Sequence, residues 1–387
     1  MADGALAGIL VADFSRVLAG PFATQMLADL GARVIKVEGP EGDETRGWRP
    51  PERDGVSTYY LGINRNKEDI VLDFREAADR AAAQELARRA DVVIENFKPG
   101  GLAKFGLDYS SVRSVNPDVV YVSISGFGDR GGAALPGYDL LVQGASGLMS
   151  LTGDPEGPAY RSGVSVFDVM TGLNATIGLL AALRHRDRTG EGQLVTVNLL
   201  STALAAMANH SSTYVAAGKV PYRMGNAHPS LFPYEPLETG DGTLIVVAAN
   251  NAQFRRLCDA LGLAGVADDP RFADGDARNR HREALRPLLL EALARKSASA
   301  WFTELTAAGI PCGPINTIDG GVALAEDLGL DPVVSVGEGD AAIPMIRNPI
   351  GLSATPPRYV SPPPALGRDS ADLLEWLDAE RTDLPDA

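Results

Sequence analysis

The chain has 387 residues, of which 45% are hydrophobic and 22% charged, a composition typical of a soluble protein with two domains, or one large domain carrying a smaller one. Its formal net charge of −15 argues against a nucleic-acid partner, because such partners require an excess of basic residues. The two cysteines, the lack of a signal-like start and the lack of an apolar run near 20 residues predict a cytoplasmic protein without disulfides or membrane spans.

The first part of the chain predicts alternating strands and helices. Gly8–Phe14 is a short, β-rich strand pattern, and Gly20-Pro21 opens a helix whose apolar face continues to Leu30. Arg33–Glu38 is a second strand, which completes a β-α-β unit and favours a parallel sheet. The pattern recurs in a helix at Ala77–Arg89 and in strands at Asp91–Glu95 and Val119–Ser125. A Rossmann-like, doubly wound α/β domain is expected.

The loop after the first strand, Ser15–Pro21, argues against a nicotinamide or flavin cofactor. It lacks the G-x-G-x-x-G pattern, and Pro21 removes an N–H group that a pyrophosphate would use. The four histidines are not spaced as metal ligands, so no metal is predicted. Cys312 is either a nucleophile or a small buried residue, and no histidine lies nearby in the sequence to activate it.

The second part of the chain predicts a change of domain. A helix at Asn174–His185, a strand at Gly192–Leu199 and a helix at Leu200–Ala217 complete a large domain at residues 1–220. A proline-rich crossing segment leads to a smaller α/β domain at 225–325, with a strand at Gly242–Ala249 and helices at Ala252–Leu261, His281–Lys296 and Ser299–Ala308. The proline-rich segment 331–387 ends in a helix at Ser370–Leu377 and is expected to return to the large domain.

Asp168 is an acidic residue in an otherwise apolar and small-residue run, at a predicted junction between an extended segment and a helix. Asp is a common helix N-cap, and a carboxylate fixed beside a pocket can also act as a nucleophile. The positive end of the helix dipole favours its ionised form. A second candidate is the loop Glu95–Gly101, which follows a parallel strand and offers an amide, an aromatic ring and a cation, or is a simple turn.

Several motifs together resemble the class III CoA-transferase family, which includes formyl-CoA transferase, carnitine CoA-transferase and α-methylacyl-CoA racemase. They occur in the same order across nearly the whole chain, which makes the set more specific than any one of them. They are D-F-S-R-V-L-A-G-P at 13–21, G-A-R-V-I-K-V-E at 31–38, A-D-V-V-I-E-N-F-K-P-G at 90–100, S-I-S-G-F-G at 123–128, Tyr138-Asp139, F-D-V-M-T-G at 167–172 and G-I-P-C-G-P at 309–314.

The resemblance implies a Rossmann-like large domain, a small domain and an interlocked homodimer. It also implies transfer of CoA from an acyl-CoA to a carboxylic acid through a covalent intermediate on Asp168, with cations and helix-end N–H groups holding the leaving thiolate. The CoA contacts that it implies are Val17, Leu72, Arg75, Asn96, Phe97, Lys104, Tyr138 and Asp139.

Departures from the family leave the acyl group open. Leu18 stands where formyl-CoA transferase has a glutamine, Gly39 replaces an arginine, and Ala248–Asn251 lacks that enzyme's glycine-rich loop, which argues against formate or oxalate. A racemase is one alternative, although Tyr138 stands where the family's racemases have a histidine, and a phenol is a poor base at neutral pH. A CoA-binding protein without catalysis is the other alternative.

Overall fold

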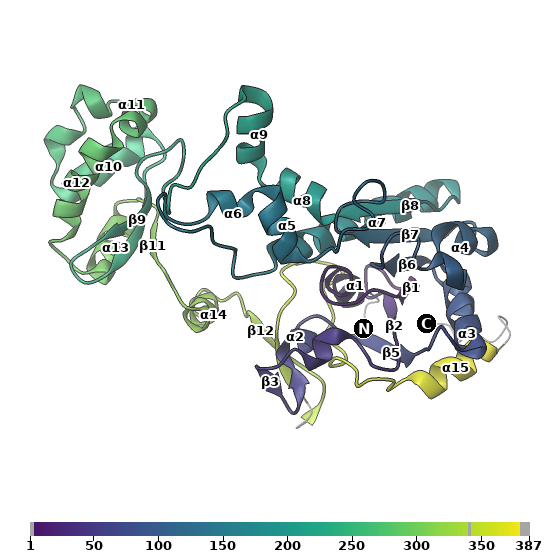
Figure 1. Ribbon diagram of the computed structural model, residues 1–387. Coiled ribbons are helices and arrows are strands. Elements are labelled where there is room, and N and C mark those ends of the chain that lie inside the picture. The colour runs from purple at the N-terminus through teal and green to yellow at the C-terminus, as the bar shows by residue number, and fades with distance from the viewer. Residues whose placement is uncertain (1–3, 340–341, 380–387) are drawn as a thin grey trace. The chain divides into compact units, whose positions relative to one another are not determined.

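A six-stranded, fully parallel β-sheet organises the larger part of the molecule in the computed structural model, which describes residues 4–339 and 342–379 (Figure 1). The strand order is β5-β2-β1-β6-β7-β8, so the chain moves outward from β1 in one direction and then in the other. This order is that of a doubly wound fold, and its point of reversal lies between β1 and β6. The strands are β1 (Leu10–Asp13), β2 (Arg33–Glu38), β5 (Lys67–Val71), β6 (Val92–Glu95), β7 (Val120–Ser125) and β8 (Leu194–Asn198).

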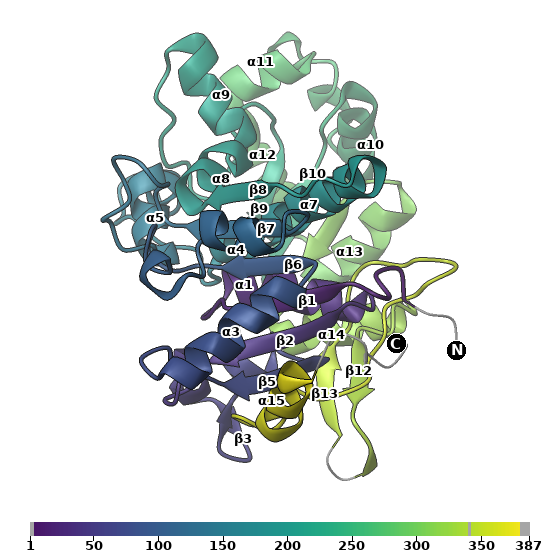
Figure 2. The ribbon, with the colours of Figure 1, turned by 90° about the vertical axis from the view of Figure 1, so that its right-hand side faces the viewer.

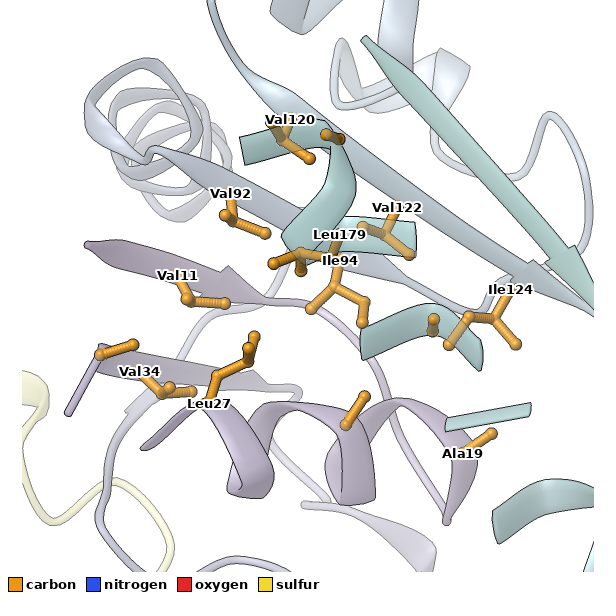
Figure 3. Packing of buried hydrophobic residues seen from close by; sticks show 14 of the residues in the cluster. Val11, Ala19, Leu27, Val34, Val92, Ile94, Val120, Val122, Ile124 and Leu179 are labelled. Atoms are coloured by element: carbon orange, nitrogen blue, oxygen red, sulfur yellow. The ribbon is translucent and has the colours of Figure 1, made fainter. Parts of the chain in front are cut away.

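Both faces of this sheet are buried, because successive strand residues enter two different hydrophobic clusters. Val11 packs with α1 (Ala19–Asp29), α7 (Val166–Thr189) and α8 (Leu199–Ala206) on one face (Figure 3). Its neighbour Ala12 packs with the helices of the other face, which are α3 (Ala77–Arg89), α4 (Tyr109–Val115) and α15 (Ser370–Asp378) (Figure 2). Helices on both faces are what a parallel sheet requires, and the predicted Rossmann-like fold is confirmed.

The remaining elements of this unit are short segments and connections. Two of the helices, α5 and α9, lie in the stretch around α7 and α8. The elements are η1 (Glu44–Gly47), β3 (Glu52–Arg53), β4 (Val56–Ser57), α2 (Thr58–Leu61), η2 (Ala103–Phe105), α5 (Asp139–Ser146), α9 (Ala208–Ala217), β12 (Val333–Val336) and β13 (Ile343–Ile346). The short helix α6 (Leu148–Leu151) begins at the last residue of this unit's first segment, and its other residues belong to the second unit.

The chain divides into two compact units. The first contains the chain up to Leu148, Arg161–Lys219 and the chain from Asp331, and the second contains Met149–Tyr160 and Val220–Leu330. In the second unit, an antiparallel sheet of order β11-β10-β9 packs with helices around a separate core. Its elements are β9 (Tyr234–Glu238), β10 (Thr243–Val247), α10 (Asn251–Leu261), η3 (Ala264–Val266), η4 (Pro270–Phe272), α11 (Gly275–Arg280), α12 (Arg282–Leu293), α13 (Ala298–Ala307), β11 (Cys312–Pro314) and α14 (Ile318–Asp327).

One predicted helix proves to be a pair of helices. The one expected at Leu200–Ala217 is interrupted after Met207, where Ala208 takes a positive φ of 35° and separates α8 from α9. At this break the sequence has no glycine or proline, so it offers no stop signal. The helix expected at His281–Lys296 is α12, whose bounds lie close to the predicted ones, and α11 is a separate helix before it.

The helix expected at Asn174–His185 is much longer than predicted, because α7 covers Val166–Thr189. By length and composition alone it could cross a membrane, contrary to the expectation of no such apolar run. A core helix of a soluble protein meets the same criteria, and α7 buries Phe167, Ala175 and Leu179 in the core beneath the sheet.

The segment before α15 runs along β5, an edge strand of the large sheet. Asn66 N–H donates to the carbonyl of Ser361 over 2.9 Å, and Val71 N–H donates to Ser370 Oγ over 3.1 Å. Asp69 N–H donates to Asp369 Oδ2 over 2.8 Å. The edge of the sheet is therefore covered by the chain's own C-terminal region, which removes free N–H groups that could pair with another strand.

Candidate active site

A cavity lies at the carboxyl ends of β1, β6 and β7, next to the point where the strand order reverses. Its wall includes residues of the loops after these strands together with Asp168 from α7. Open α/β sheets bind their ligands at this position because the diverging loops leave a crevice there. Four of the predicted CoA contacts line it with Asp168, namely Val17, Asn96, Phe97 and Tyr138.

A second cavity of about 340 Å³ continues from the first, since Arg16, Glu44 and Phe97 line both. Leu72 and Arg75, two further predicted contacts, lie in its wall with the aromatic rings of Phe74 and Phe105. The pair of cavities thus forms an elongated site with an aromatic section at the end remote from Asp168. An elongated ligand that carries a flat ring would fit this arrangement.

Lys104 and Asp139 are not among the lining residues of either cavity. The Lys104 ammonium lies 4.7 Å from the ring centre of Phe105, so it is adjacent to the second cavity. Asp139 is buried, with 6% of its surface exposed, and its contacts are with the protein. Arg75 is paired with Asp73 at 2.6 Å and is exposed.

Asp168 lies inside the first turn of α7 and is not its N-cap, because the helix starts at Val166, after Ser165. Asp139 performs the capping: one oxygen, Oδ1, accepts from Phe167 N–H over 2.8 Å and from Asp168 N–H over 3.1 Å. These two amides are therefore already bonded within the protein.

Asp139 is itself held by α5 and the loop before α7. Gln143 Nε2 donates to Asp139 Oδ2 over 2.5 Å, while Gln143 Oε1 accepts from Ser162 N–H over 2.8 Å. Asp139 and Gln143, one helical turn apart on α5, therefore fix the start of α7 and with it the position of Asp168.

The pKa of the Asp168 carboxyl is raised, although its place at the positive end of a helix predicted that the ionised form would be favoured. Burial, and after it the charge of Asp139, raises the pKa of Asp168 to about 7. The loss of water and the like charge outweigh the helix dipole, whose effect is worth only ~0.3–1 kcal/mol near a surface. Near neutral pH, Asp168 is thus divided between its acid and its carboxylate form.

Tyr59, which no sequence pattern marked, lies close to this carboxyl, and Trp48 packs on Tyr59. The Tyr59 side chain bonds to Ser165, and burial followed by the charge of Asp168 raises the pKa of Tyr59 to about 12. The ring of Trp48 packs on Tyr59 edge to face with 5.1 Å between centres. Both residues belong to a region of short elements without helical or strand periodicity, so no pattern could have marked them.

The loop after β1 is held in place by a hydrogen bond to Asp43, a carboxylate that is paired with the buried Lys36. Val17 has a φ of 69°, which is strained for a β-branched residue, and its N–H donates to Asp43. Asp43 in turn binds the fully buried Lys36 ammonium at 2.9 Å. Asn96 holds the same loop from the side, accepting from Arg16 N–H over 3.0 Å and donating to the Arg16 carbonyl over 2.7 Å. The amide predicted as a ligand contact therefore positions the loop.

Two positions in the motifs around Asp168 require glycine, because a side chain there would clash with a neighbouring segment. A Cβ on Gly20 would lie 2.2 Å from the Cβ of Ser15, so only glycine allows the tight turn into α1. A Cβ on Gly172 would lie 2.6 Å from the carbonyl oxygen of Ala19, so glycine lets α7 approach the start of α1. The F-D-V-M-T-G motif thus contains Asp168 and, one helical turn later, Gly172, whose close contact with Ala19 fixes the position of α7.

Comparison with known proteins agrees with this geometry. Residues 6–370 match the model of CoA-transferase family III. The chain is 44% identical to the succinate–glutarate CoA-transferase of Agrobacterium fabrum, covering 98% of both chains, and 37% identical to the acetyl-CoA:oxalate CoA-transferase of Acetobacter aceti, covering 90% of both. A crystal structure of a CaiB/BaiF family protein from Brucella suis superposes with a TM-score of 0.87 at 40% identity, covering 97% of this chain and 100% of that one.

The family match includes the residues of the cavity, the start of α7 and most of both units. Both relatives are named as CoA-transferases. The protein is accordingly an enzyme that transfers CoA between an acyl-CoA and a carboxylic acid. The chain belongs to CoA-transferase family III.

Proposed function

We propose that acyl-CoA occupies the two joined cavities, with its thioester beside Asp168 and its adenine in the aromatic section near Leu72, Phe74 and Phe105. The shared wall of the cavities supports this placement. Lys104, next to Phe105, and Arg75 supply cations for the phosphate groups. Phe97, which lines both cavities, would contact the middle of the ligand.

We further propose that Asp168 is the nucleophile. Its carboxylate attacks the thioester carbonyl, the C–S bond breaks, and a mixed anhydride and CoA thiolate result. The thiolate then attacks the Asp168 carbonyl carbon, which releases the first acid and leaves an aspartyl-CoA thioester. The acceptor carboxylate attacks this thioester to form a second anhydride, and the returning thiolate takes its acyl group and frees Asp168.

The retained thiolate needs positive polarity close to Asp168. We propose the first turn of α1 for this role, since Leu18 and Ala19 line the cavity at the start of that helix. The corresponding amides of α7 are bound to Asp139. Retention conserves the thioester's free energy, because no step hydrolyses it.

We propose that the acids exchanged are dicarboxylic acids. The support is the names of the relatives, which include succinate, glutarate and oxalate. Leu18 in the cavity wall argued against oxalate for this chain, whereas the Acetobacter aceti relative acts on oxalate at 37% identity. Oxalate therefore belongs in the substrate panel beside succinate and glutarate.

We also propose a homodimer. The mutually packed helices α5, α7, α8 and α9 expose apolar side chains that a second copy would cover. Ile177 is 65% exposed and Val215 81% exposed in the single chain. The other members of this surface are Leu140, Leu141, Leu204 and Tyr214.

Intact-protein mass spectrometry tests the nucleophile. After incubation with succinyl-CoA and no acceptor, we expect an added acyl or CoA mass on the native chain and on the control Asp276→Ala, whose carboxylate is exposed in α11. Asp168→Ala should show no adduct. An adduct that persists in Asp168→Ala would overturn the assignment, as would solvent deuterium at the α-carbon of a recovered branched ester without any adduct, which indicates racemase chemistry.

A further inference from the structure

A separate cavity of about 360 Å³ lies wholly within the second unit and has an arginine-rich wall. Its three arginines come from two segments, Arg223 from the crossing segment and Arg282 and Arg286 from α12. Asn279 and Tyr222 add neutral polar groups to the wall, and Glu283 adds one carboxylate, which pairs with Arg286 at 3.1 Å. So dense a group of guanidinium ions is unexpected in a chain whose net charge is −15.

Two of these guanidinium groups have no carboxylate partner within the described residues. Arg223 donates to the carbonyls of Asp154 and Gly157 over 3.0 and 2.9 Å. Arg282 donates to the His228 carbonyl over 3.0 Å and to the backbone carbonyl and side-chain oxygen of Asn279. Neutral carbonyls fix the direction of the two side chains but leave their charges uncompensated.

One nitrogen of Arg282 is also left without any partner. Its Nη1 atom is buried and donates no hydrogen bond to the part of the chain that the structure describes. A buried donor on a charged group lowers stability when it stays unsatisfied.

The third arginine is neutralised and serves as a rigid part of the wall. Arg286 binds both oxygens of the buried Glu235, at 2.8 and 3.0 Å. The guanidinium carbons of Arg282 and Arg286 lie 5.7 and 5.4 Å from the ring centre of buried Phe232, which supports both side chains from below. The donors are therefore preorganised for a ligand with oxyanion groups.

We propose that this cavity is a binding site for a small dicarboxylic acid. Planar carboxylates match the fork of an arginine, and the two uncompensated guanidinium groups, Arg223 and Arg282, suit two carboxylates on one molecule. The volume is that of a small-molecule site. The choice of dicarboxylate over phosphate, which shares the oxyanion chemistry, rests on the proposed function.

Calorimetric titration of the full-length protein with glutarate, without acyl-CoA, tests the site. We expect binding that Arg282→Gln and Arg223→Gln each weaken at least tenfold. Arg255→Gln is the matched control, because Arg255 lies in the same unit, is exposed and pairs with Asp268. Butyrate, which has one carboxylate, should bind at least tenfold more weakly than glutarate, and phosphate should not compete at equal concentration.

The proposal is wrong if Arg282→Gln and Arg223→Gln, folded as judged by circular dichroism, bind glutarate as the native chain does. Tighter binding of phosphate than of glutarate would also overturn it. Asp168→Ala separates this test from that of the nucleophile. It should lose the covalent adduct and still bind glutarate with an affinity that depends on Arg282.

Discussion

At the scale of single residues, the unusual feature is a nucleophile candidate that is half protonated at neutral pH. Burial, and after it the charge of Asp139, raises the pKa of Asp168. Burial, and after it the charge of Asp168, raises the pKa of Tyr59. In the proposed mechanism only the ionised carboxylate of Asp168 is nucleophilic, so its charge state should set the rate of adduct formation.

The first prediction concerns the pH dependence of adduct formation. The pKa of Asp168 is raised from 3.8 to about 7, so the carboxylate is lost as pH falls through about 7. The rate of adduct formation from acyl-CoA should therefore rise about tenfold per pH unit below pH 7 and level off above it. Stopped-flow or quench-flow measurement between pH 5 and 9 checks this, and a rate independent of pH from 5 to 7 would contradict it.

A second prediction follows for stability. Between pH 4 and 7 the folded chain holds a proton on Asp168 that the unfolded chain releases, so this group lowers stability as pH rises through that window. Asp168→Asn removes the effect and should stabilise the protein at pH 8 by ~1–2 kcal/mol, discounted for the partial exposure of the side chain. Urea unfolding at pH 8 and pH 5 measures it, and an equal gain at both values would exclude this cause.

The third prediction assigns Asp139 a positioning role. Asp139→Asn keeps an oxygen for the N–H groups of Phe167 and Asp168 but removes the charge that raises the pKa of Asp168. The acidic limb of the rate profile should move to lower pH. Asp276→Asn serves as the control, and an unmoved limb in Asp139→Asn would show that the charge does not reach Asp168.

At the scale of elements, the placement of Asp168 depends on the crossing of α7 and α1. Gly172 permits that crossing because a side chain there would meet the carbonyl of Ala19 at 2.6 Å. We expect Gly172→Ala to lower the unfolding free energy by ~1–3 kcal/mol through overpacking and to slow adduct formation.

Gly321→Ala is the matched control for that variant. Gly321 is also helical, in α14, and a Cβ there meets nothing within 4 Å. Because alanine has the higher helix propensity, this variant should be neutral or stabilising by ~0.5–1 kcal/mol. Urea denaturation of both variants compares them, and equal destabilisation would mean that the contact with Ala19 is not the cause.

The strands that the sequence predicted correctly have apolar residues on both faces. Arg33–Glu38 was placed at its observed bounds, and so was the helix Ala77–Arg89, whose sides differ clearly in polarity. Strand β5 was missed because its sequence is K-E-D-I-V. Its Lys67 is fully buried and its charge is met by Asp13, which is far away in the sequence, so local polarity suggested an exposed turn.

Site residues that stand in recognisable sequence motifs could be predicted. Residues that only the tertiary fold brings to the site could not. Asp168, Asn96 and Phe97 stand in motifs that could be compared with a family, and the structure places all three at one cavity. Tyr59 approaches Asp168 only through the tertiary fold. The pKa of Asp168 was misjudged because a sequence shows a helix end but shows neither burial nor the nearness of Asp139.

At the scale of the whole molecule, the exposed apolar surface on α5, α7, α8 and α9 predicts the assembly. Light scattering should give a mass of about twice the chain mass of 40.7 kDa. Interlocking of two chains would keep that mass unchanged on dilution to nanomolar concentration, because separation then requires unfolding. A monomer mass at micromolar concentration would exclude the homodimer.

The covering of β5 by residues near Ser361 and Ser370 has a consequence for biosynthesis. The second unit is complete once Leu330 has left the ribosome, whereas the large sheet still has an uncovered edge at that moment. Translation that stops early would release a chain with a bare strand edge, a recognised starting point for aggregation. Because the C-terminal region is synthesised last, only a chain translated to its end can cover this edge of the sheet that carries the candidate active site.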